Sequence, residues 1–340
     1  MSEINVLYPF DNNYAPYAGI SMTSLLENNR KADSIHIYIL GFDISEGNID
    51  ALRSTADRYG RDITFIDPSS IDEYIQSFDM PSYRGARIAV ARLFITRFIP
   101  DDVKRLLYLD SDTLITGDLR ELMSCDLCGM SAGMVCDSVA RDYKLLMGFT
   151  DNDDYYNGGV ILYDLDEWKK RNCSERIENH IRNVRNNYEA LDQDLINIVL
   201  KGEIHKLDIK YNLQPFHLVY PVKTYLNVYG DSGYYGAGAI DRASKDAVIL
   251  HAFRYLGVFP WHKNTLHPCA DVFNQYKTIS EWKDIPPAEE GCQPLSIKLE
   301  RIACAILPKQ LFLRVFRAVF KSSMKRIEYQ IRSGNKYRNI

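Results

Sequence analysis

The sequence predicts an α/β fold with a mostly parallel central sheet. Through the first two-thirds of the 340 residues, short runs rich in β-branched and aromatic residues alternate with helix-like runs, as in successive βαβ units. The run RLLYL over 105–109 is almost entirely apolar, which is typical of a buried strand. It stops on Asp110 and Asp112, which are costly to bury unpaired, so we expect this strand to reach the edge of the sheet there.

The individual elements follow in chain order. Strands are expected at 4–8, 34–40, 63–67, 105–109, 131–135, 157–165 and 247–251. Helical patterns cover 14–28, 48–60, 86–99, 174–186 and 192–200. The segment 208–247 is rich in Gly, Tyr and Asn and is expected to be loop-like. The C-terminal part divides the chain further, into a domain over 1–283, a Pro-rich linker over 284–294 and a tail over 295–340.

Composition is that of an ordinary globular protein, with 46% hydrophobic and 25% charged residues. The N-terminal residues show no pattern of a secretory signal, and no apolar run approaches the roughly 20 residues of a membrane span. Seven cysteines at irregular spacing are therefore expected to be reduced, in a cytoplasmic protein. The single CxxC, Cys125 and Cys128, is expected to be incidental rather than a zinc or redox site.

The tail is predicted to be a basic amphipathic helix. Residues 295–340 contain eleven Lys and Arg against two Glu, a balance of +9 in a chain whose net charge is −4. An apolar stripe is expected at Phe312, Phe316, Val319, Met324, Ile327 and Ile331, and a basic stripe at Arg314, Arg317, Lys321 and Lys325. Such a helix suits an anionic membrane surface, here the inner face of the plasma membrane, and its removal is expected to spare catalysis. The alternative is a helix packed on the body or on a partner. Nucleic acid is not expected as a partner, because the remaining chain is acidic and shows no binding motif.

Asp110 and Asp112 are candidate metal ligands. Spacing alone is a weak signal, because three other Asp-x-Asp triplets occur, at 151/153, 164/166 and 192/194. Only the pair at 110/112 directly follows a long buried strand, and ligands of open α/β sheets bind at the carboxyl ends of strands. Two adjacent carboxylates repel each other unless a cation neutralises them, and hard oxygen ligands suit Mg²⁺ or Mn²⁺. A solvated acidic turn is the alternative.

Six stretches together carry a resemblance to a known family. They are FDNNYAPYAGISMTSLLEN, ARLFI, LLYLDSDTLITGDL, YYNGGVILYDLDEWKK, LDQDLIN and H…PW, in this order between about residues 4 and 265. In order and spacing the chain resembles family 8 of the retaining glycosyltransferases, and particularly the bacterial lipopolysaccharide glucosyl- and galactosyltransferases. The resemblance implies a GT-A fold, which is Rossmann-like, and transfer of a hexose from UDP-glucose or UDP-galactose to a saccharide or glycolipid acceptor.

The resemblance also implies a set of donor-site residues. The metal ligands would be Asp110, Asp112 and His251, and the imidazole favours Mn²⁺ over Mg²⁺. The uridine would be held by Asp11, Asn13 and Tyr14, with Tyr14 stacking on the base. The same three residues also suit an Asx turn and helix cap, which is the alternative reading.

Further residues are implied at the sugar and the reacting carbon. Donor sugar and diphosphate contacts would come from Arg92, Asp110, Asn157 and Gly158, with Gly158 and Gly159 allowing the sugar close to the backbone. The catalytic set would be Gln193, Asp192 and Asp137, with Gln193 nearest the anomeric carbon. Arg92 lies in an otherwise apolar helical run and needs an anionic partner, so a buried structural ion pair is an alternative for it.

One stretch departs from the family. The family pattern H-x2-G-x2-K-P-W places a glycine and a lysine at the diphosphate, whereas this chain reads HAFRYLGVFPW over 251–261. Gly257 is displaced, and Phe259 stands where the lysine is expected. We expect Arg254 or Lys263 to supply the missing charge. The departure leaves open a second function, a membrane-peripheral nucleotide-sugar-binding protein without turnover.

Overall fold

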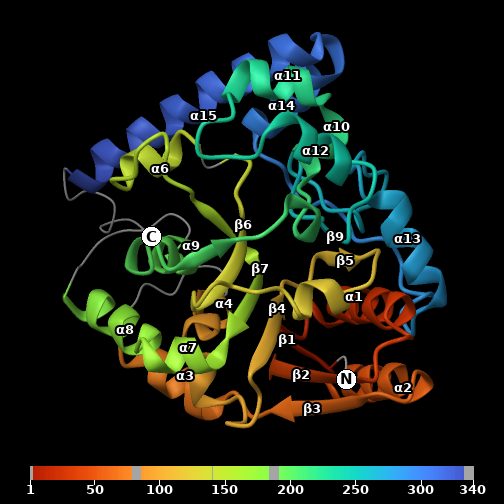
Figure 1. Ribbon diagram of the computed structural model, residues 1–340. Coiled ribbons are helices and arrows are strands. Elements are labelled where there is room, and N and C mark those ends of the chain that lie inside the picture. Colours follow the sequence, from red (N-terminus) through yellow and green to blue (C-terminus); the bar gives the residue numbers. More distant parts are fainter. Residues whose placement is uncertain (1–2, 79–85, 140, 184–190, 333–340) are drawn as a thin grey trace.

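The computed structural model describes residues 3–78, 86–139, 141–183 and 191–332 (Figure 1). The end of the helix expected at 174–186 and the last eight residues of the tail lie outside this description. So do the side chains of Met324, Ile327 and Ile331.

A seven-stranded sheet forms the centre of the molecule, in the order β3-β2-β1-β4-β7-β6-β8. All neighbouring pairs are parallel except those of β7, which runs antiparallel to β4 and β6. The strands are β1 (Glu3–Asp11), β2 (Ser34–Phe42), β3 (Asp62–Ile66), β4 (Arg105–Leu109), β6 (Ala132–Cys136), β7 (Tyr156–Asp164) and β8 (Ile204–Lys206). The prediction of a mostly parallel sheet is therefore confirmed. Its central strands are buried along most of their length, which explains their nearly continuous apolar runs.

A second, two-stranded sheet pairs β5 (Thr113–Ile115) with β9 (Ile249–His251) in antiparallel register. The predicted strand at 247–251 thus exists, but it lies outside the main sheet. Its register sets Thr113 opposite His251. This small sheet therefore brings the end of β9 to the loop that follows β4.

The helices are α1 (Ala15–Asn28), α2 (Glu46–Arg58), α3 (Ser69–Gln76), α4 (Ala86–Ala91), α5 (Arg120–Met123), α6 (Tyr143–Leu146), α7 (Leu165–Lys170), α8 (Cys173–Asn183), α9 (Leu191–Val199), α10 (Pro215–Val219), α11 (Val222–Tyr229), α12 (Ala237–Ala243), α13 (Ala270–Ile279), α14 (Leu295–Ile306) and α15 (Lys309–Arg332). The helix expected over 86–99 is α4 followed by a 3-10 segment over Arg92–Arg97.

The prediction that the segment 208–247 is loop-like is wrong. The segment holds the three short helices α10 to α12 and a 3-10 turn. Pro215 begins α10, and α11 ends at Gly230, whose φ of 74° lies in the left-handed region. Buried tyrosines such as Tyr225 and Tyr234 pack between these helices. The aromatic content of the segment reflects a small core, which its many glycines and asparagines obscure in the sequence.

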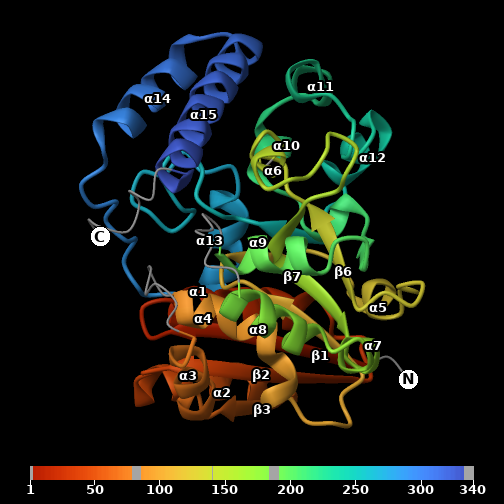
Figure 2. The same cartoon turned by 90° about the vertical axis from the view of Figure 1, so that its left-hand side faces the viewer.

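The helix α15 contacts α6 and α11, beside which Figure 1 draws it, and Figure 2 shows it side by side with α14. Phe312 and Leu313 are 2% and 0% exposed, and Phe316 and Phe320 are partly buried. Among the described side chains, the inward apolar face of the helix therefore follows 312, 316 and 320. Val319, which the sequence placed on the same stripe, is 61% exposed. The alternative reading, a helix packed on the body, accounts for this face.

Among the described residues, no helix combines the length and the apolar character needed to cross a membrane. All seven cysteines are free thiols. The division into a domain, a linker and a tail stays a prediction.

Candidate active site

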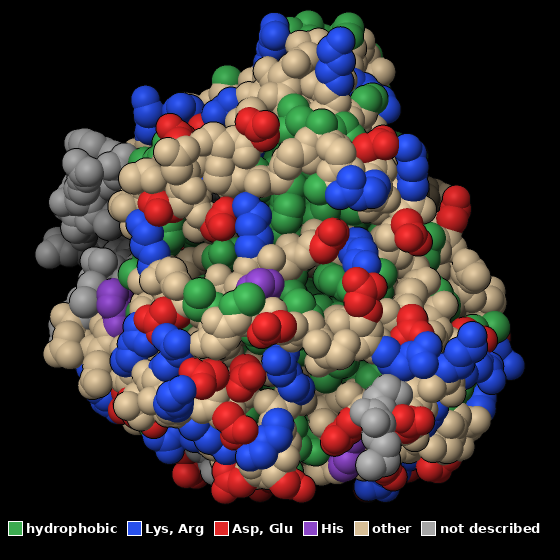
Figure 3. Space-filling model, in the orientation of Figure 1, with side chains coloured by type: hydrophobic (Ala, Val, Ile, Leu, Met, Phe, Trp, Pro, Cys, Tyr) green, Lys and Arg blue, Asp and Glu red, His purple; other side chains and the backbone are tan. Residues whose placement is uncertain are grey.

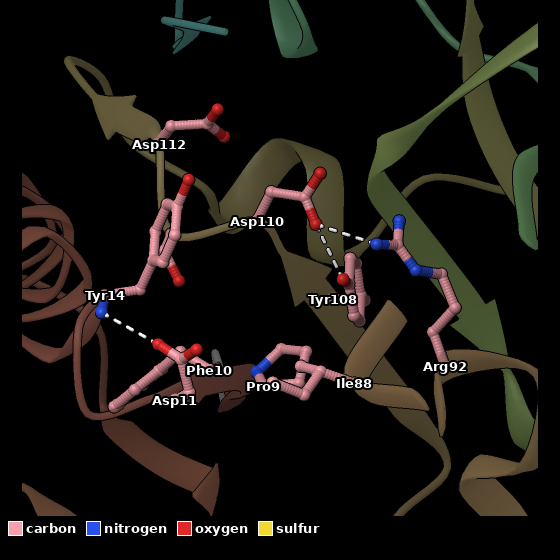
Figure 4. Close-up of a pocket in the computed structure, with 10 residues that line it drawn as sticks. Pro9, Phe10, Asp11, Tyr14, Ile88, Arg92, Tyr108, Asp110 and Asp112 are labelled. Carbon is pink, nitrogen blue, oxygen red and sulfur yellow. Dashed lines mark hydrogen bonds and ion pairs between the residues drawn. The ribbon is translucent and has the colours of Figure 1, made fainter. Parts of the chain in front are cut away.

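A pocket of about 350 Å³ opens at the carboxyl ends of β1 and β4 (Figure 4). It is lined by Pro9, Phe10, Asp11, Tyr14, Ile88, Arg92, Tyr108, Asp110, Ser111 and Asp112. Six of the predicted site residues therefore lie in or next to one pocket once His251 is added from β9. The place agrees with the rule that open α/β sheets bind ligands beyond the carboxyl ends of their strands.

Asp110, Asp112 and His251 form a cluster whose ligand atoms all lie within 4.8 Å of one another. His251 Nε2 is 3.2 Å from Asp112 Oδ1 and 3.8 Å from Asp110 Oδ2. Asp112 Oδ1 is buried, and no donor in the described part of the chain is in hydrogen-bonding geometry with it. A buried carboxylate oxygen in that state has a polar partner missing, and a cation can supply it.

The other face of the His251 ring fixes its tautomer. Nδ1 lies 3.1 Å from Asn157 Oδ1 and 3.0 Å from Asn212 Oδ1, which are both acceptors. The Asn157 oxygen also accepts hydrogen bonds from Gly159 N and Asn212 Nδ2. Nδ1 must therefore carry a proton, and the neutral ring directs the lone pair of Nε2 toward the two carboxylates. Hydrogen bonds to the ring nitrogen that does not face the metal orient metal-binding histidines in this way.

The electrostatics show that the cluster favours positive charge at its centre, which a proton on His251 Nε2 can supply and a bound cation can replace. Burial raises the pKa of Asp110, although Arg92 opposes the shift. Burial lowers the pKa of His251, but the charge and hydrogen bond of Asp112 and the charges of Asp110 and Asp137 together outweigh it, so the pKa of the imidazole is raised overall. Two carboxylates and an imidazole lone pair would repel one another without positive charge between them. The three residues thus fit a divalent cation.

Arg92 is buried and connects Asp110 of the metal cluster with Asp192 of α9. Its guanidinium lies 3.0 Å from Asp110 Oδ1 and 2.9 Å from Asp192 Oδ2, and it also donates to the carbonyl of Gly158. It lies over the ring of Tyr108, 4.3 Å from the centroid. The alternative reading, a buried ion pair, therefore describes its contacts here. Direct contact with the donor stays a prediction.

The proposed sugar-side residues form one hydrogen-bonded group. Asp137 Oδ2 accepts from Asn157 Nδ2 at 3.0 Å and from Gln193 Nε2 at 3.3 Å. Gln193 Oε1 accepts from the backbone N–H of Gly158 at 2.9 Å. The amide of Gln193 is thereby fixed in orientation. The structure thus brings Asp137, Asn157 and Gln193 together from β6, β7 and α9.

The glycine pair serves packing as well. A Cβ on Gly159 would lie 2.0 Å from His251 Cε1, so only glycine allows the imidazole to take its place. The packing of His251 is thus one reason for glycine at 159, and the prediction that the pair admits the sugar stays a prediction.

Asp11 and Tyr14 line the pocket across from Arg92 (Figure 4), whereas Asn13 is exposed and is not among the lining residues. Asp11 Oδ1 accepts from the backbone N–H groups of Asn13 and Tyr14, at 3.0 and 3.1 Å, which is the Asx turn of the alternative reading. Tyr14 is 39% exposed at the rim, and its ring meets Trp261 edge to face, with the centroids 6.3 Å apart. An exposed aromatic ring held in this way is available for stacking.

Of the two candidates for the missing lysine, Arg254 lies near the pocket. The guanidinium of Arg254 lies over the ring of Phe259, 5.4 Å from its centroid, and Phe259 stacks on Trp261, which in turn meets Tyr14. Lys263 is 59% exposed and pairs with Glu289 at 3.1 Å, on the side of the linker. Gly257 has a φ of 78°, and a Cβ there would lie 2.5 Å from Ile297 of α14. Gly257 therefore packs against α14, and its contact with the diphosphate stays a prediction.

Sequence reasoning missed Asn212, which is fully buried and holds the ring of His251. It follows the 3-10 turn Ile209–Tyr211, in the segment taken for a loop. No spacing in the sequence links it to His251, so only the fold reveals it.

Residues 5–265 match the family described as glycosyl transferase family 8. The chain belongs to this family. It is 27% identical over 279 residues to general stress protein A of Bacillus subtilis, covering 81% of this chain and 93% of that protein. It is 27% identical to a lipopolysaccharide 1,2-glucosyltransferase of Escherichia coli (84% and 81% covered). It is 28% identical to a lipopolysaccharide 1,3-galactosyltransferase of Salmonella typhimurium (82% and 79% covered).

The fold agrees with solved structures. An active-site mutant of LgtC matches with a TM-score of 0.68 and 22% identity, over 87% of this chain and 99% of LgtC. The galactosyltransferase LgtC in complex with donor and acceptor sugar analogues matches with a TM-score of 0.66, at 22% identity and the same coverage. The predicted GT-A fold is therefore confirmed.

Proposed function

We propose that the protein is a metal-dependent retaining hexosyltransferase that moves glucose or galactose from a UDP-sugar to a saccharide or glycolipid acceptor. The family supports sugar transfer. The names of the relatives from Escherichia coli and Salmonella typhimurium support a hexose and an acceptor in lipopolysaccharide or another cell-surface glycan. The observation that carries metal dependence is the Nε2 lone pair of His251, directed at Asp110 and Asp112.

The ligand set favours Mn²⁺ over Mg²⁺, because one of the three ligands is an imidazole. When bound, the cation would neutralise charge that develops on the leaving diphosphate. Tyr14 would stack on the uracil ring, with Asp11 and Asn13 beside it. Arg254 would contact the diphosphate in place of the family's lysine.

At the sugar, Asp137 and Asn157 would hold the hydroxyl groups, and Gln193 would face the anomeric carbon. An amide is a poor nucleophile, which favours attack by the acceptor on the same face as the departing diphosphate, through an oxocarbenium-like state. The departing phosphate oxygen would take the proton of the acceptor hydroxyl. No separate general base is needed in this scheme.

UDP release from UDP-glucose and UDP-galactose tests the proposal, with saccharide acceptors and with Mn²⁺ present or chelated. We expect turnover with Mn²⁺, loss on chelation and recovery on adding Mn²⁺ back. Titration calorimetry of Mn²⁺ gives a second readout, in which Asp112→Asn should bind the ion more weakly than the wild type. A protein that binds Mn²⁺ and UDP-sugar but releases no UDP would instead be a binding protein without turnover.

We also propose that α14 and α15 attach the protein to the inner, cytoplasmic face of the plasma membrane. Seven apolar side chains on these helices are between 41% and 73% exposed: Leu295, Leu299, Ile302, Ile306, Leu311, Val315 and Val319. Exposed Lys298 and Arg314 lie among them. Figure 3 shows basic and hydrophobic side chains together at the top of the molecule, where Figure 1 places α11 and α14. Apolar groups beside basic ones suit an anionic interface.

Sedimentation with vesicles tests this attachment. The wild type should bind vesicles that contain phosphatidylglycerol more tightly than neutral ones, and high salt should weaken binding by screening. The double variant Leu299→Asp/Ile302→Asp should lose most binding. Leu266→Asp is the matched control, because Leu266 is 82% exposed but lies outside the tail. Equal binding to neutral vesicles, or none at all, would contradict the proposal.

A further inference from the structure

The tail helix α15 makes a specific ionic contact with the body. The guanidinium of Arg317 donates two hydrogen bonds to the carboxylate of Asp142, from Nε to Oδ2 at 2.6 Å and from Nη2 to Oδ1 at 2.8 Å. It also donates to the carbonyl of Val228 and lies over the ring of Tyr229, 5.1 Å from the centroid. The side chain of Asp142 is only 4% exposed. A bidentate pair at a buried carboxylate is among the stronger ionic contacts of proteins.

Asp142 lies close in the chain to residues that contact the candidate active site. It follows Asp137 by five residues and stands directly before Tyr143. The hydroxyl of Tyr143 donates to Asp194 Oδ2 at 2.5 Å. Asp194 is fully buried in α9, next to Gln193. The contact made by Arg317 is thus connected to Gln193 through Tyr143, the neighbour of Asp142, and through Asp194.

The hydroxyl of Tyr155 also links Asp194 to Gln193. Tyr155 donates to Asp194 Oδ1, and its oxygen lies 3.5 Å from Gln193 Nε2. Tyr155 also packs in a small cluster with Tyr143 and Phe149, against which Phe320 of α15 is partly buried. The helix α15 therefore supports the first turn of α9 by two routes, one ionic and one apolar.

We propose that Arg317 is a positioning residue for sugar transfer, which rests on the proposed function of the site and replaces the expectation that removal of the tail would spare catalysis. Without its guanidinium, the buried carboxylate of Asp142 would keep only Lys321, at 3.6 Å. Such a group is costly to leave poorly paired, so the segment around Asp142 would move toward solvent. Tyr143 would then withdraw from Asp194, and the amide of Gln193 would lose its fixed place.

The consequence should be confined to the reacting carbon and should spare the nucleotide. Arg317 has no contact, among those described, with the metal cluster or with Tyr14. Its loss should therefore lower kcat and leave the affinity for UDP unchanged. A displacement of about 1 Å at a reacting centre can reduce turnover by roughly 100-fold, so we expect about 10-fold to 100-fold for Arg317→Gln.

Steady-state kinetics with the full-length protein test this inference. Arg317→Gln should lower kcat, with KM for the donor and the Kd of UDP within about twofold of the wild type. Arg317→Lys should recover part of the loss, because it keeps the charge but not the fork. Arg314→Gln is the matched control, since it removes the same charge from an exposed position of the same helix. It should leave kcat unchanged.

Tyr143→Phe tests the path without disturbing the tail, because it removes one hydroxyl and keeps the ring. It should also lower kcat and spare UDP binding. The inference is wrong if both Arg317→Gln and Tyr143→Phe turn over like the wild type, or if UDP affinity falls as much as kcat. It falls as well if the wild type shows no turnover, but that result would first refute the proposed function.

Discussion

Replacing Phe312 by alanine tests whether the tail is part of the folded body. Phe312 is 2% exposed, and its ring lies parallel to that of Tyr220, with centroids 6.3 Å apart and an angle of 11°. It also contacts Phe316, at 6.1 Å between centroids. Truncating a buried Phe to Ala costs about 3–5 kcal/mol, from lost burial and the cavity left behind. We therefore expect Phe312→Ala to destabilise the protein clearly.

The size of the thermal shift follows from the chain length. Unfolding entropy is about 2.1 cal/mol/K per residue, which gives about 0.7 kcal/mol/K for 340 residues. The loss of about 3–5 kcal/mol at Phe312 then corresponds to a fall in Tm of about 4–7 °C. Val319→Ala, on the outward face at 61% exposure, should change stability by less than about 0.5 kcal/mol and Tm by less than about 1 °C.

Circular dichroism melting of the two variants is the assay, with limited trypsin digestion of the basic tail as a second readout. Phe312→Ala should melt earlier and lose its tail to trypsin faster, whereas Val319→Ala should match the wild type. Equal Tm values for the wild type and both variants would show that α15 does not pack as described. Equal destabilisation by both variants would mean that the helix is turned differently.

The remaining predictions concern the donor site. Asp112→Asn should abolish Mn²⁺-dependent UDP release without unfolding the protein, because it removes one carboxylate of the cluster and keeps the size of the side chain; full activity would refute the metal assignment. Asn212→Ala should weaken Mn²⁺ binding by about 10-fold to 100-fold, because the ring of His251 loses a hydrogen-bond partner that orients it. An unchanged affinity for Mn²⁺ in calorimetry would contradict this. Arg254→Ala should weaken UDP binding in fluorescence titration and Lys263→Ala should not; the reverse order would show that our account of the loop is wrong. Gln193→Ala should lower kcat more than donor affinity, and a pure loss of affinity would reduce its role to sugar binding.

The sequence by itself determined the features that depend on neighbouring residues. The βαβ alternation predicted the parallel sheet, and the apolar run before Asp110 predicted a buried strand that ends at the edge of the sheet. Both follow from local rules, because strand burial and the polarity of strand ends are properties of short segments. The spaced motifs were specific enough for the family because their order along the chain is part of the signal.

Only the tertiary structure decided which distant groups meet. The register of β5 against β9 sets His251 beside Asp112, and the fold adds Asn212 behind the ring. The choice of Arg254 over Lys263 as the diphosphate contact stays a prediction, which the pairing of Lys263 with Glu289 supports.

The tail shows the same limit at the scale of one residue. Periodicity predicted an amphipathic helix, but Val319 and Phe320 are both apolar, and a helical stripe can follow either. The small cluster beneath Phe320 selects the inward residue, and that choice is made by contacts far apart in the chain. Helical spacing fixes a face to within about one residue, and packing against the rest of the molecule fixes the remainder.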